Sequence, residues 1–412
     1  MRTTIVEWQN AGGGVAKGKV RWDPVRSLWW TGMVGAALVG GVATFSWSAF
    51  ALFLATTAFV LLFGHSLGSH RKLIHDSFQC PTWLEYLLVY SGVQVGLSGP
   101  LGLVRQHDLR DYAQRQADCH PYLRHGRSFW TDAWWQLHCR LELADPPLLL
   151  LRPDLAGNRF YRLLERTWML QQLPPIALLY LAGGWAFVIW GGCARIAAGV
   201  TGHWLIGWFA HNHGPMHHVV DGAAVQGRNV KLASLLTMGE SWHNNHHAYP
   251  GSARLGLYAG EWDPGWWVLT LLRKCGLVWA LRLPQECVWR EELRQVDSAR
   301  MVAAVSRRPF NLVVRDIFAV AAQVRTRRAP MALQGPFATL PEPALRILLG
   351  AGVSLAHDPA MTRMQMRHGA ITIIGLPALM LALGSRNLPS FILAMALLPA
   401  AMLAEVLRER LS

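Results

Sequence analysis

Long apolar runs constrain the fold of this chain more than any other feature of its sequence. Residues 27–46 and 47–68 each have the ~20 residues that a helix needs to cross the hydrocarbon core of a bilayer. Together they predict a transmembrane hairpin, and runs at 172–190 and 194–210 predict a second one. Because 52% of the 412 residues are hydrophobic and only 16% are charged, we predict an all-α integral membrane protein with a four-helix transmembrane core.

Basic residues on both flanks of the first hairpin predict its orientation. Lys17, Lys19 and Arg21 precede it, and Arg71 and Lys72 follow it, so the positive-inside rule places both ends in the cytosol. The basic residues behind the net charge of +14 lie in short loops and tails between apolar runs. This placement suits the inner membrane surface and argues against nucleic acid as a partner. We therefore expect a multi-pass protein whose active site faces the cytosol.

The apolar run at 83–104 is not expected to cross the membrane. A full crossing would put His107 on the opposite side of the bilayer from His70 and His75. We therefore expect this run to lie in, or dip into, the cytosolic interface.

The rest of the chain is predicted to form a helical cap on the cytosolic side and two flanking tails. Charged, aromatic and histidine residues are mixed in the stretches expected to form the cap, 105–165 and 211–300. An Arg-rich amphipathic part and further apolar runs predict a helical appendage at the end of the chain. The predicted divisions are a basic N-terminal tail at 1–26, a membrane and cap domain at 27–298, and a C-terminal amphipathic and apolar helical extension at 299–412.

Most of the 17 histidines lie near the cytosolic end of an apolar run or within the predicted cap. In an α-helix, residues i, i+3 and i+4 share a face, so His243, His246 and His247 are expected to present three imidazoles in one direction. His70 and His75 are about 140° apart around an α-helix, so they can converge only across a helix end or a kink. Many imidazoles without a haem or cysteine ligand pattern favour non-haem iron, which can activate oxygen.

The remaining histidines divide into three sets. His107 and His211 lie near the expected ends of apolar runs and are further candidate ligands. Isolated histidines near a membrane interface are usually hydrogen-bonded polar groups, and we interpret one set in this way: His120, His125, His138, His357 and His368. The sequence leaves the third set open: His65, His203, His213, His217 and His218.

Two of the histidine clusters resemble the histidine boxes of the membrane fatty acyl desaturase family, which acts on acyl-CoA and acyl lipids. The segment His70-Arg71-Lys72-Leu73-Ile74-His75 resembles the first box, HRxxxH, and residues 239–250 resemble the last box, GExxHNxHHxxP. The similarity covers roughly residues 30–285 and implies two non-haem iron ions over the mouth of a bent acyl tunnel. The ligands that this resemblance implies are His70, His75, His107, His211, His243, His246 and His247. Glu240, Asn244 and Asn245 are expected to accept hydrogen bonds from the ligand rings.

The middle box departs from the family pattern HRxHH, because this chain has His107-Asp108-Leu109-Arg110-Asp111. Asp111 could supply a carboxylate ligand, whereas Arg110 cannot bind a cation. Gly207 stands where the family usually carries an asparagine, four residues before the histidine that matches His211. We therefore expect two metals with an altered ligand set, for which the candidate replacements are His65, His203 and His213.

The resemblance implies an oxygen-dependent di-iron desaturase that introduces a double bond into a lipid acyl chain. Its substrate would be a fatty acyl lipid or an acyl thioester. Its electrons would come from a separate ferredoxin or small haem protein, since the chain has no fused haem or iron–sulfur pattern. Two alternatives stay open: an acyl or alkyl hydroxylase on the same scaffold, and a non-catalytic, desaturase-derived lipid-binding protein.

Overall fold

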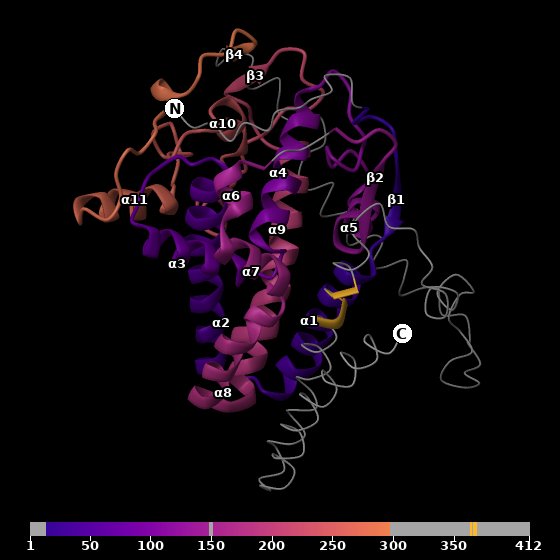
Figure 1. The fold of residues 1–412 in the computed structure, drawn as a ribbon, viewed down its shortest axis with the longest axis vertical. Helices are drawn as coiled ribbons and strands as arrows, with labels where there is room; N and C mark the ends of the chain where they lie inside the picture. The colour runs from indigo at the N-terminus through magenta and orange to yellow at the C-terminus, as the bar shows by residue number, and fades with distance from the viewer. Residues whose placement is uncertain (1–13, 148–150, 297–362, 365, 369–412) are drawn as a thin grey trace, which may run out of the picture.

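The computed structural model describes residues 14–147, 151–296, 363–364 and 366–368. Helices make up most of this part of the chain, as predicted, with four short strands in two sheets. Figure 1 shows the long helices gathered toward one end of the molecule, and the strands β3 and β4 with the helix α10 at the other. Apart from residues 363–364 and 366–368, the predicted C-terminal extension at 299–412 lies outside the described residues.

Two helices lie where the first hairpin is predicted, α1 (Pro24–Ala43) and α2 (Trp47–Phe59). Asp23 caps α1 by accepting a hydrogen bond from the backbone N–H of Arg26, and Ser46 caps α2 in the same way. The turn at residues 44–46 separates the two helices close to the predicted boundary. The capping residues therefore fix the start of both helices.

α2 continues without a break into a π-helix, η1 (Val60–Ile74). Together they form a helix of 28 residues, Trp47–Ile74, whose most apolar window has a mean hydropathy of 1.9. A π-helix is bonded from residue i to residue i+5, and the N–H of His75 donates to the carbonyl of His70 at 3.1 Å in this way. Residues five apart therefore lie about one turn above each other, and His65, His70 and His75 share this spacing.

The second long apolar stretch is Leu170–Asn212, which has 43 residues and a mean hydropathy of 1.7 in its most apolar window. It comprises η2 (Leu170–Gln172), α8 (Leu173–Val188), η3 (Ile189–Ala194) and α9 (Arg195–Asn212). Among the described residues, this stretch and Trp47–Ile74 are the ones long and apolar enough to cross a membrane.

The break in this stretch lies at Gly183 and Gly184, and not between residues 190 and 194 as predicted. Gly184 has φ of 62°, a conformation that glycine adopts without steric cost. The second glycine pair, Gly191 and Gly192, stays helical, and a Cβ on Gly191 would lie 3.1 Å from Leu179 and 3.2 Å from Leu52. Of the two pairs, the first adopts non-helical backbone angles.

The apolar run at 83–104 does not form one continuous helix. It is divided between α3 (Thr82–Val93) and α4 (Pro100–Arg115), with a break at residues 94–99. α3 begins seven residues after His75, and α4 brings His107 back to 4.8 Å from His75, measured between ring centroids. The two ends of the run therefore lie at the same end of η1, as the prediction of a non-crossing segment requires.

Close contact between α3 and η1 depends on glycines in the π-helix. A Cβ atom on Gly64 would lie 2.2 Å from the carbonyl oxygen of Ser91, and one on Gly68 would lie 2.2 Å from that of Leu88. These oxygens belong to the backbone and cannot rotate away. The helices must separate if either glycine acquires a side chain.

Gly68→Ala is accordingly expected to lower the free energy of unfolding by about 1–3 kcal/mol. The loss should appear as a lower melting temperature of the purified protein in detergent. The control is Gly35→Ala in α1, where an added Cβ meets nothing within 4 Å. An equal effect of both substitutions would contradict the role assigned to Gly68.

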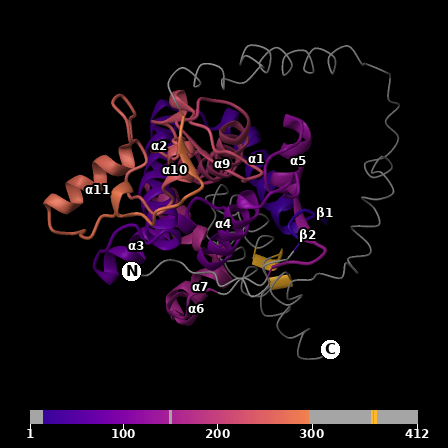
Figure 2. The ribbon, with the colours of Figure 1, turned by 90° about the horizontal axis from the view of Figure 1, so that it is seen from above.

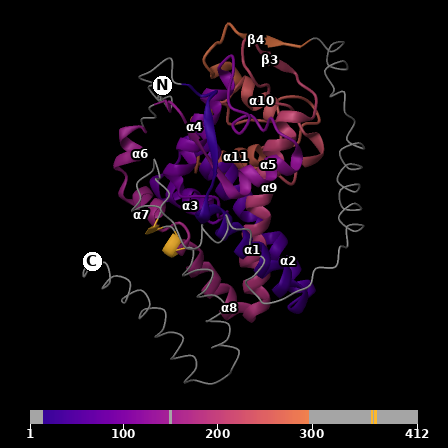
Figure 3. The ribbon, with the colours of Figure 1, turned by 90° about the vertical axis from the view of Figure 1, so that its right-hand side faces the viewer.

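The remaining elements surround the ends of the long helices, as Figures 2 and 3 show. β1 (Gly18–Trp22) pairs antiparallel with β2 (Cys139–Leu143), so part of the predicted tail at 1–26 is a β-strand. β3 (His218–Val220) pairs with β4 (Leu293–Gln295). The other elements are α5 (Phe129–His138), α6 (Pro153–Gly157), α7 (Arg159–Thr167), η4 (Lys231–Ala233), α10 (His243–Ala248), α11 (Pro264–Lys274) and η5 (Pro284–Glu286).

Candidate metal centre

Seven histidines from four separate stretches of the chain meet in two groups. Within each group, every histidine contributes one ring nitrogen, and these nitrogens all lie within 4.8 Å of one another. The first, called here the four-histidine group, contains His70, His75, His107 and His246. The second, called here the three-histidine group, contains His211, His243 and His247. These seven are the histidines that the sequence singled out as ligands.

The four-histidine group is assembled by η1, α4 and α10. The π-helical turn brings the rings of His70 and His75 to 4.8 Å between centroids, although residues five apart diverge on an α-helix. The ring of His246 lies 4.5 Å from that of His70 and 4.8 Å from that of His75. The winding of η1 is therefore the local feature that builds this group.

The three-histidine group joins the last turn of α9 to α10. Nε2 of His243 lies 3.1 Å from Nε2 of His211 and 3.0 Å from Nε2 of His247. Three ring nitrogens of the same kind thus converge on one point. Such convergence of basic nitrogens is the arrangement that a cation stabilises.

α10 divides its histidines between the two groups. The helix itself was predicted, but the expectation that His243, His246 and His247 point in one direction is not what the structure has. His243 and His247, four residues apart, stay together with ring centroids 4.5 Å apart. His246 is 5.9 Å from each of them and faces η1 and α4. This short helix therefore bridges the two groups.

The rings fit a transition metal in charge and in unsatisfied bonding capacity. Burial lowers the pKa of His75, His243 and His246 well below the usual range, and that of His247 to about 3, so these rings are neutral at physiological pH. Nε2 of His75 and Nδ1 of His246 are buried and have no hydrogen-bond partner among the described residues. Neutral imidazoles with free lone pairs are ligands for iron and similar metals, rather than for magnesium or calcium.

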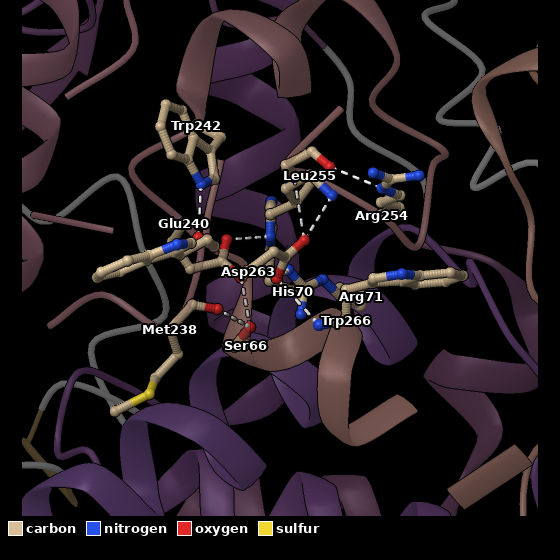
Figure 4. Close-up of polar contacts among 12 residues, drawn as sticks. Ser66, His70, Arg71, Met238, Glu240, Trp242, Arg254, Leu255, Asp263 and Trp266 are labelled. Atoms are coloured by element: carbon tan, nitrogen blue, oxygen red, sulfur yellow. Dashed lines mark hydrogen bonds and ion pairs between the residues drawn. The ribbon is translucent and has the colours of Figure 1, made fainter. Parts of the chain in front are cut away.

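Glu240 orients the first histidine of the four-histidine group, as Figure 4 shows. Its Oε2 lies 2.5 Å from Nδ1 of His70, and its Oε1 accepts a hydrogen bond of 2.6 Å from Ser66. Burial opposes the carboxylate charge, but His70 and Arg71 outweigh burial and lower the pKa of Glu240 to about 2. An ionised acceptor at Nδ1 leaves Nε2 of His70 to face the other rings.

Glu240→Gln is expected to weaken metal binding about 10-fold, because it removes the charge that holds this tautomer. The measurement is the iron content per chain after equilibration with a graded series of chelator concentrations. Glu292→Gln serves as control, since the side chain of Glu292 is 44% exposed and only 3.9 Å from Arg290. Unchanged iron retention in Glu240→Gln would argue against the orienting role.

A buried ion pair joins the first box to the chain that follows the last box. Nη2 of Arg71 donates to Oδ1 of Asp263 at 2.8 Å, and the two side chains are 1% and 2% exposed. Oδ2 of Asp263 also accepts from the backbone N–H of Leu255 and of Gly256 (Figure 4). A Cβ on Gly265 would lie 1.4 Å from Arg71, so only glycine fits there. This network holds η1 against the loop that leads into α11.

The sequence suggested that Asn244 and Asn245 accept hydrogen bonds from ring nitrogens, but in the structure they bond to other groups. Asn244 accepts from the backbone N–H groups of His217 and His218 and donates to two carbonyls. Asn245 donates to the carbonyl of Leu255 and to Glu261. The two amides therefore tie α10 to the cap, while Glu240 alone of the three expected acceptors contacts a ligand ring.

The candidate replacement ligands stay outside both groups. Asp111 accepts a hydrogen bond of 2.8 Å from Arg115, and His213 packs on Trp208 with ring centroids 5.0 Å apart. His65 and His203 form a separate pair at 5.1 Å. The altered middle box is therefore not compensated by these side chains joining the groups.

Sequence reasoning missed the environment of His125, which it treated as an ordinary polar histidine. The ring of His125 stacks on that of His211, with centroids 5.6 Å apart and an interplanar angle of 14°. Its Nδ1 lies 2.8 Å from Asp132, and its Nε2 contacts Arg110. A Cβ on Gly207 would lie 2.9 Å from Nε2 of His125. The missing side chain at Gly207 was the sequence signal that another group occupies this space.

Comparison with known proteins places these observations in a wider context. No family profile matches the chain. It is 36% identical over 234 residues to an sn-2 palmitoyl-lipid 9-desaturase of Nostoc sp. (strain 36), covering 57% of this chain and 81% of that protein. It is 32% identical over 268 residues to an sn-1 stearoyl-lipid 9-desaturase of Anabaena variabilis, covering 65% and 96%. An acyl-CoA 5-desaturase of Anemone leveillei is 35% identical over 245 residues, covering 59% and 74%.

Proposed function

From the premise that this chain belongs to the membrane fatty acyl desaturase family, we propose that it introduces a double bond into a lipid acyl chain at a two-iron site. It is therefore an oxidoreductase of lipid metabolism. The observation that carries the proposal is the meeting of seven histidines from η1, α4, α9 and α10 in two adjacent groups. A lipid-binding scaffold has no need for two sets of converging imidazoles.

The four-histidine and three-histidine groups would each hold one metal ion. When bound, the two irons would supply the oxygen-dependent oxidation of an unactivated C–H bond, which no side-chain acid or base can perform. The chain's own contribution is to hold the rings close together and to orient them. Glu240 fixes the tautomer of His70, and the Arg71–Asp263 pair fixes η1 against the cap.

The membrane arrangement in this proposal has four crossing helices in two hairpins, with the cap on the cytosolic side. Two features support it. His70 and His75 lie at one end of the apolar helix Trp47–Ile74, and His211 lies at one end of the stretch Leu170–Asn212. Arg71 and Lys72 lie at the same end as His75 and follow the positive-inside rule. We take residues 27–298 as the unit that carries the activity and 299–412 as an extension.

The substrate in this proposal is an acyl lipid or an acyl thioester, and the electrons come from an external ferredoxin or small haem protein. Curated relatives named for acyl lipids and for acyl-CoA both align with the chain, so the relatives' names support either substrate. The reaction removes two hydrogens from adjacent carbons and consumes dioxygen, two electrons and two protons, giving the double bond and two molecules of water.

Expression of the full chain in a host with a defined fatty acid profile tests the proposal. Mass spectrometry of the total fatty acids is expected to reveal a product that has lost two hydrogens, and double-bond mapping gives its position. A product that has gained one oxygen would identify a hydroxylase instead. An unchanged profile, obtained with iron-loaded protein and a supplied electron donor, would overturn the proposed activity.

A further inference from the structure

We propose that the two metal positions of this chain are unequal: the four-histidine group binds its metal tightly, and the three-histidine group binds the second metal weakly and exchangeably. This inference rests on the proposed function, because it concerns the same site. It follows from differences in ligand number, in hydrogen bonding and in nearby charge between the two groups.

The first difference is the number of ligands and their support. Four imidazoles converge in one group and three in the other, and neither group includes a carboxylate or thiolate within the part of the chain that the structure describes. The four-histidine group also has the carboxylate of Glu240 at Nδ1 of His70. Such an acceptor strengthens metal binding by holding the ring in place.

The second difference is a hydrogen bond that competes with a metal. Nε2 of the Gln114 amide lies 3.2 Å from Nε2 of His211 and 2.8 Å from the carbonyl of Leu123. An amide nitrogen only donates, so Nε2 of His211 must accept. This is the same ring nitrogen that converges with His243 at 3.1 Å. A metal in the three-histidine group therefore has to displace the amide of Gln114, whose side chain is buried.

The third difference is a fixed cation beside the three-histidine group. Asp132, which is fully buried, accepts from Nδ1 of His125 at 2.8 Å and from Trp204 at 2.9 Å. With its Nδ1 proton directed at Asp132, His125 must accept at Nε2, which is where Arg110 donates. The guanidinium of Arg110 is thereby held against the ring that stacks on His211. A positive charge in this place repels a second divalent cation.

Arg110 and Asp111 occupy the two positions at which the family's middle box carries histidines. Arg110 and Gln114 are four residues apart on α4 and so lie on one face of that helix. One helix face thus delivers a cation and an amide donor toward the three-histidine group, whereas His107 on the same helix joins the four-histidine group. The substitutions therefore affect one group and spare the other.

Stepwise metal titration tests the inference. The full chain, purified in detergent and freed of metal by a chelator, is titrated with Co(II) while the visible d–d absorbance and the bound metal per chain are measured. We expect two steps, the second at least ~10-fold weaker than the first. His75→Ala should remove the tight step, and His211→Ala should remove only the weak one. Two steps of equal affinity, or loss of the tight step in His211→Ala, would overturn the inference.

Two variants remove the features proposed to weaken metal binding by the three-histidine group. Arg110→His combined with Asp111→His adds two imidazoles to α4 and removes the cation, so the second step should tighten at least ~10-fold. The control is Arg105→His, which adds an imidazole at an exposed position of α4. If the double variant does not fold, Gln114→Leu provides a second route, because it frees Nε2 of His211 and should also tighten the second step.

The outcomes separate this inference from the function on which it rests. If the double variant Arg110→His with Asp111→His and the variant Gln114→Leu both fold and leave the second step unchanged, the unequal-site inference is overturned. Two equally tight metals in the unmodified protein would do the same and leave the desaturase proposal standing. Binding of no Co(II) at either position would overturn both.

Discussion

Replacing His246 with alanine is expected to lower product formation at least ~100-fold, to the background of the expression host. Loss of a residue that only supports a ligand typically lowers metal affinity or activity 10–100-fold, so loss of a ligand should have at least that effect. His246 is the residue through which α10 joins the four-histidine group, 4.5 Å from His70 between ring centroids. Alanine is a strong helix former, so α10 itself should persist.

The measurement for His246→Ala is the yield of unsaturated product together with the iron content of the purified protein. His120→Ala is the matched control, because His120 lies in the cap, stacks on Trp135 and belongs to neither group. It should retain both product and iron. Full desaturation by His246→Ala would contradict the assignment of the four-histidine group as a metal site.

Asp263→Ala is expected to lower the free energy of unfolding by about 3–5 kcal/mol, because it removes the hydrogen-bonded counter-ion of the buried Arg71 guanidinium and leaves only the more distant Glu240 carboxylate, 3.9 Å away. Arg71 is 1% exposed and Asp263 also satisfies two backbone N–H groups of the loop at 255–256. Both losses act on the same contact between η1 and the cap. Thermal unfolding in detergent, followed by tryptophan fluorescence, measures the change.

Asp118→Ala is the control for that experiment. Asp118 is 72% exposed and 3.9 Å from Arg124, so its ion pair should contribute between 0 and about 1 kcal/mol. Similar melting temperatures for Asp118→Ala and Asp263→Ala would contradict the importance given to the buried pair. A large loss for Asp263→Ala alone would support it.

The sequence predicted which histidines lie close together better than how they divide into groups. Spacing correctly indicated that His243, His246 and His247 lie on one helix, but a local pattern cannot reveal which partners approach that helix from each side. Here η1 and α4 approach His246, while α9 approaches the other two. Membership in each group is decided by contacts between segments far apart in the chain, and such contacts leave no trace in local spacing.

The winding of η1 and the position of the second hairpin turn escaped prediction for a related reason. An α-helical reading of His70 and His75 required a kink or a helix end, since it assumed 3.6 residues per turn. The π-helix instead accompanies the close packing of Gly64 and Gly68 against the backbone of α3. Likewise, the apolar runs at 172–190 and 194–210 predicted the second break between residues 190 and 194, whereas the structure has it inside the first run, at Gly183 and Gly184.

The position of the His125 ring depends on Gly207, which has no side chain to occupy the same space. Gly207 is unremarkable within an apolar helix, and its meaning emerges only when the ring of His125 is found 2.9 Å from where a Cβ would be. Arg110, in turn, could be excluded as a ligand from chemistry alone. Its attachment to His125 and through it to Asp132 required the fold.

The π-helical winding of η1 would also link the geometry of this helix to the affinity of an ion bound by its histidines. If this segment became an ordinary α-helix, His70 and His75 would lie about 140° apart around the helix axis and could no longer bind the same cation. By thermodynamic linkage, the free energy gained when an ion binds both rings would stabilise the π-helical form of this segment relative to the α-helical form. The concentration of iron would then shift the equilibrium between the π-helical and the α-helical form.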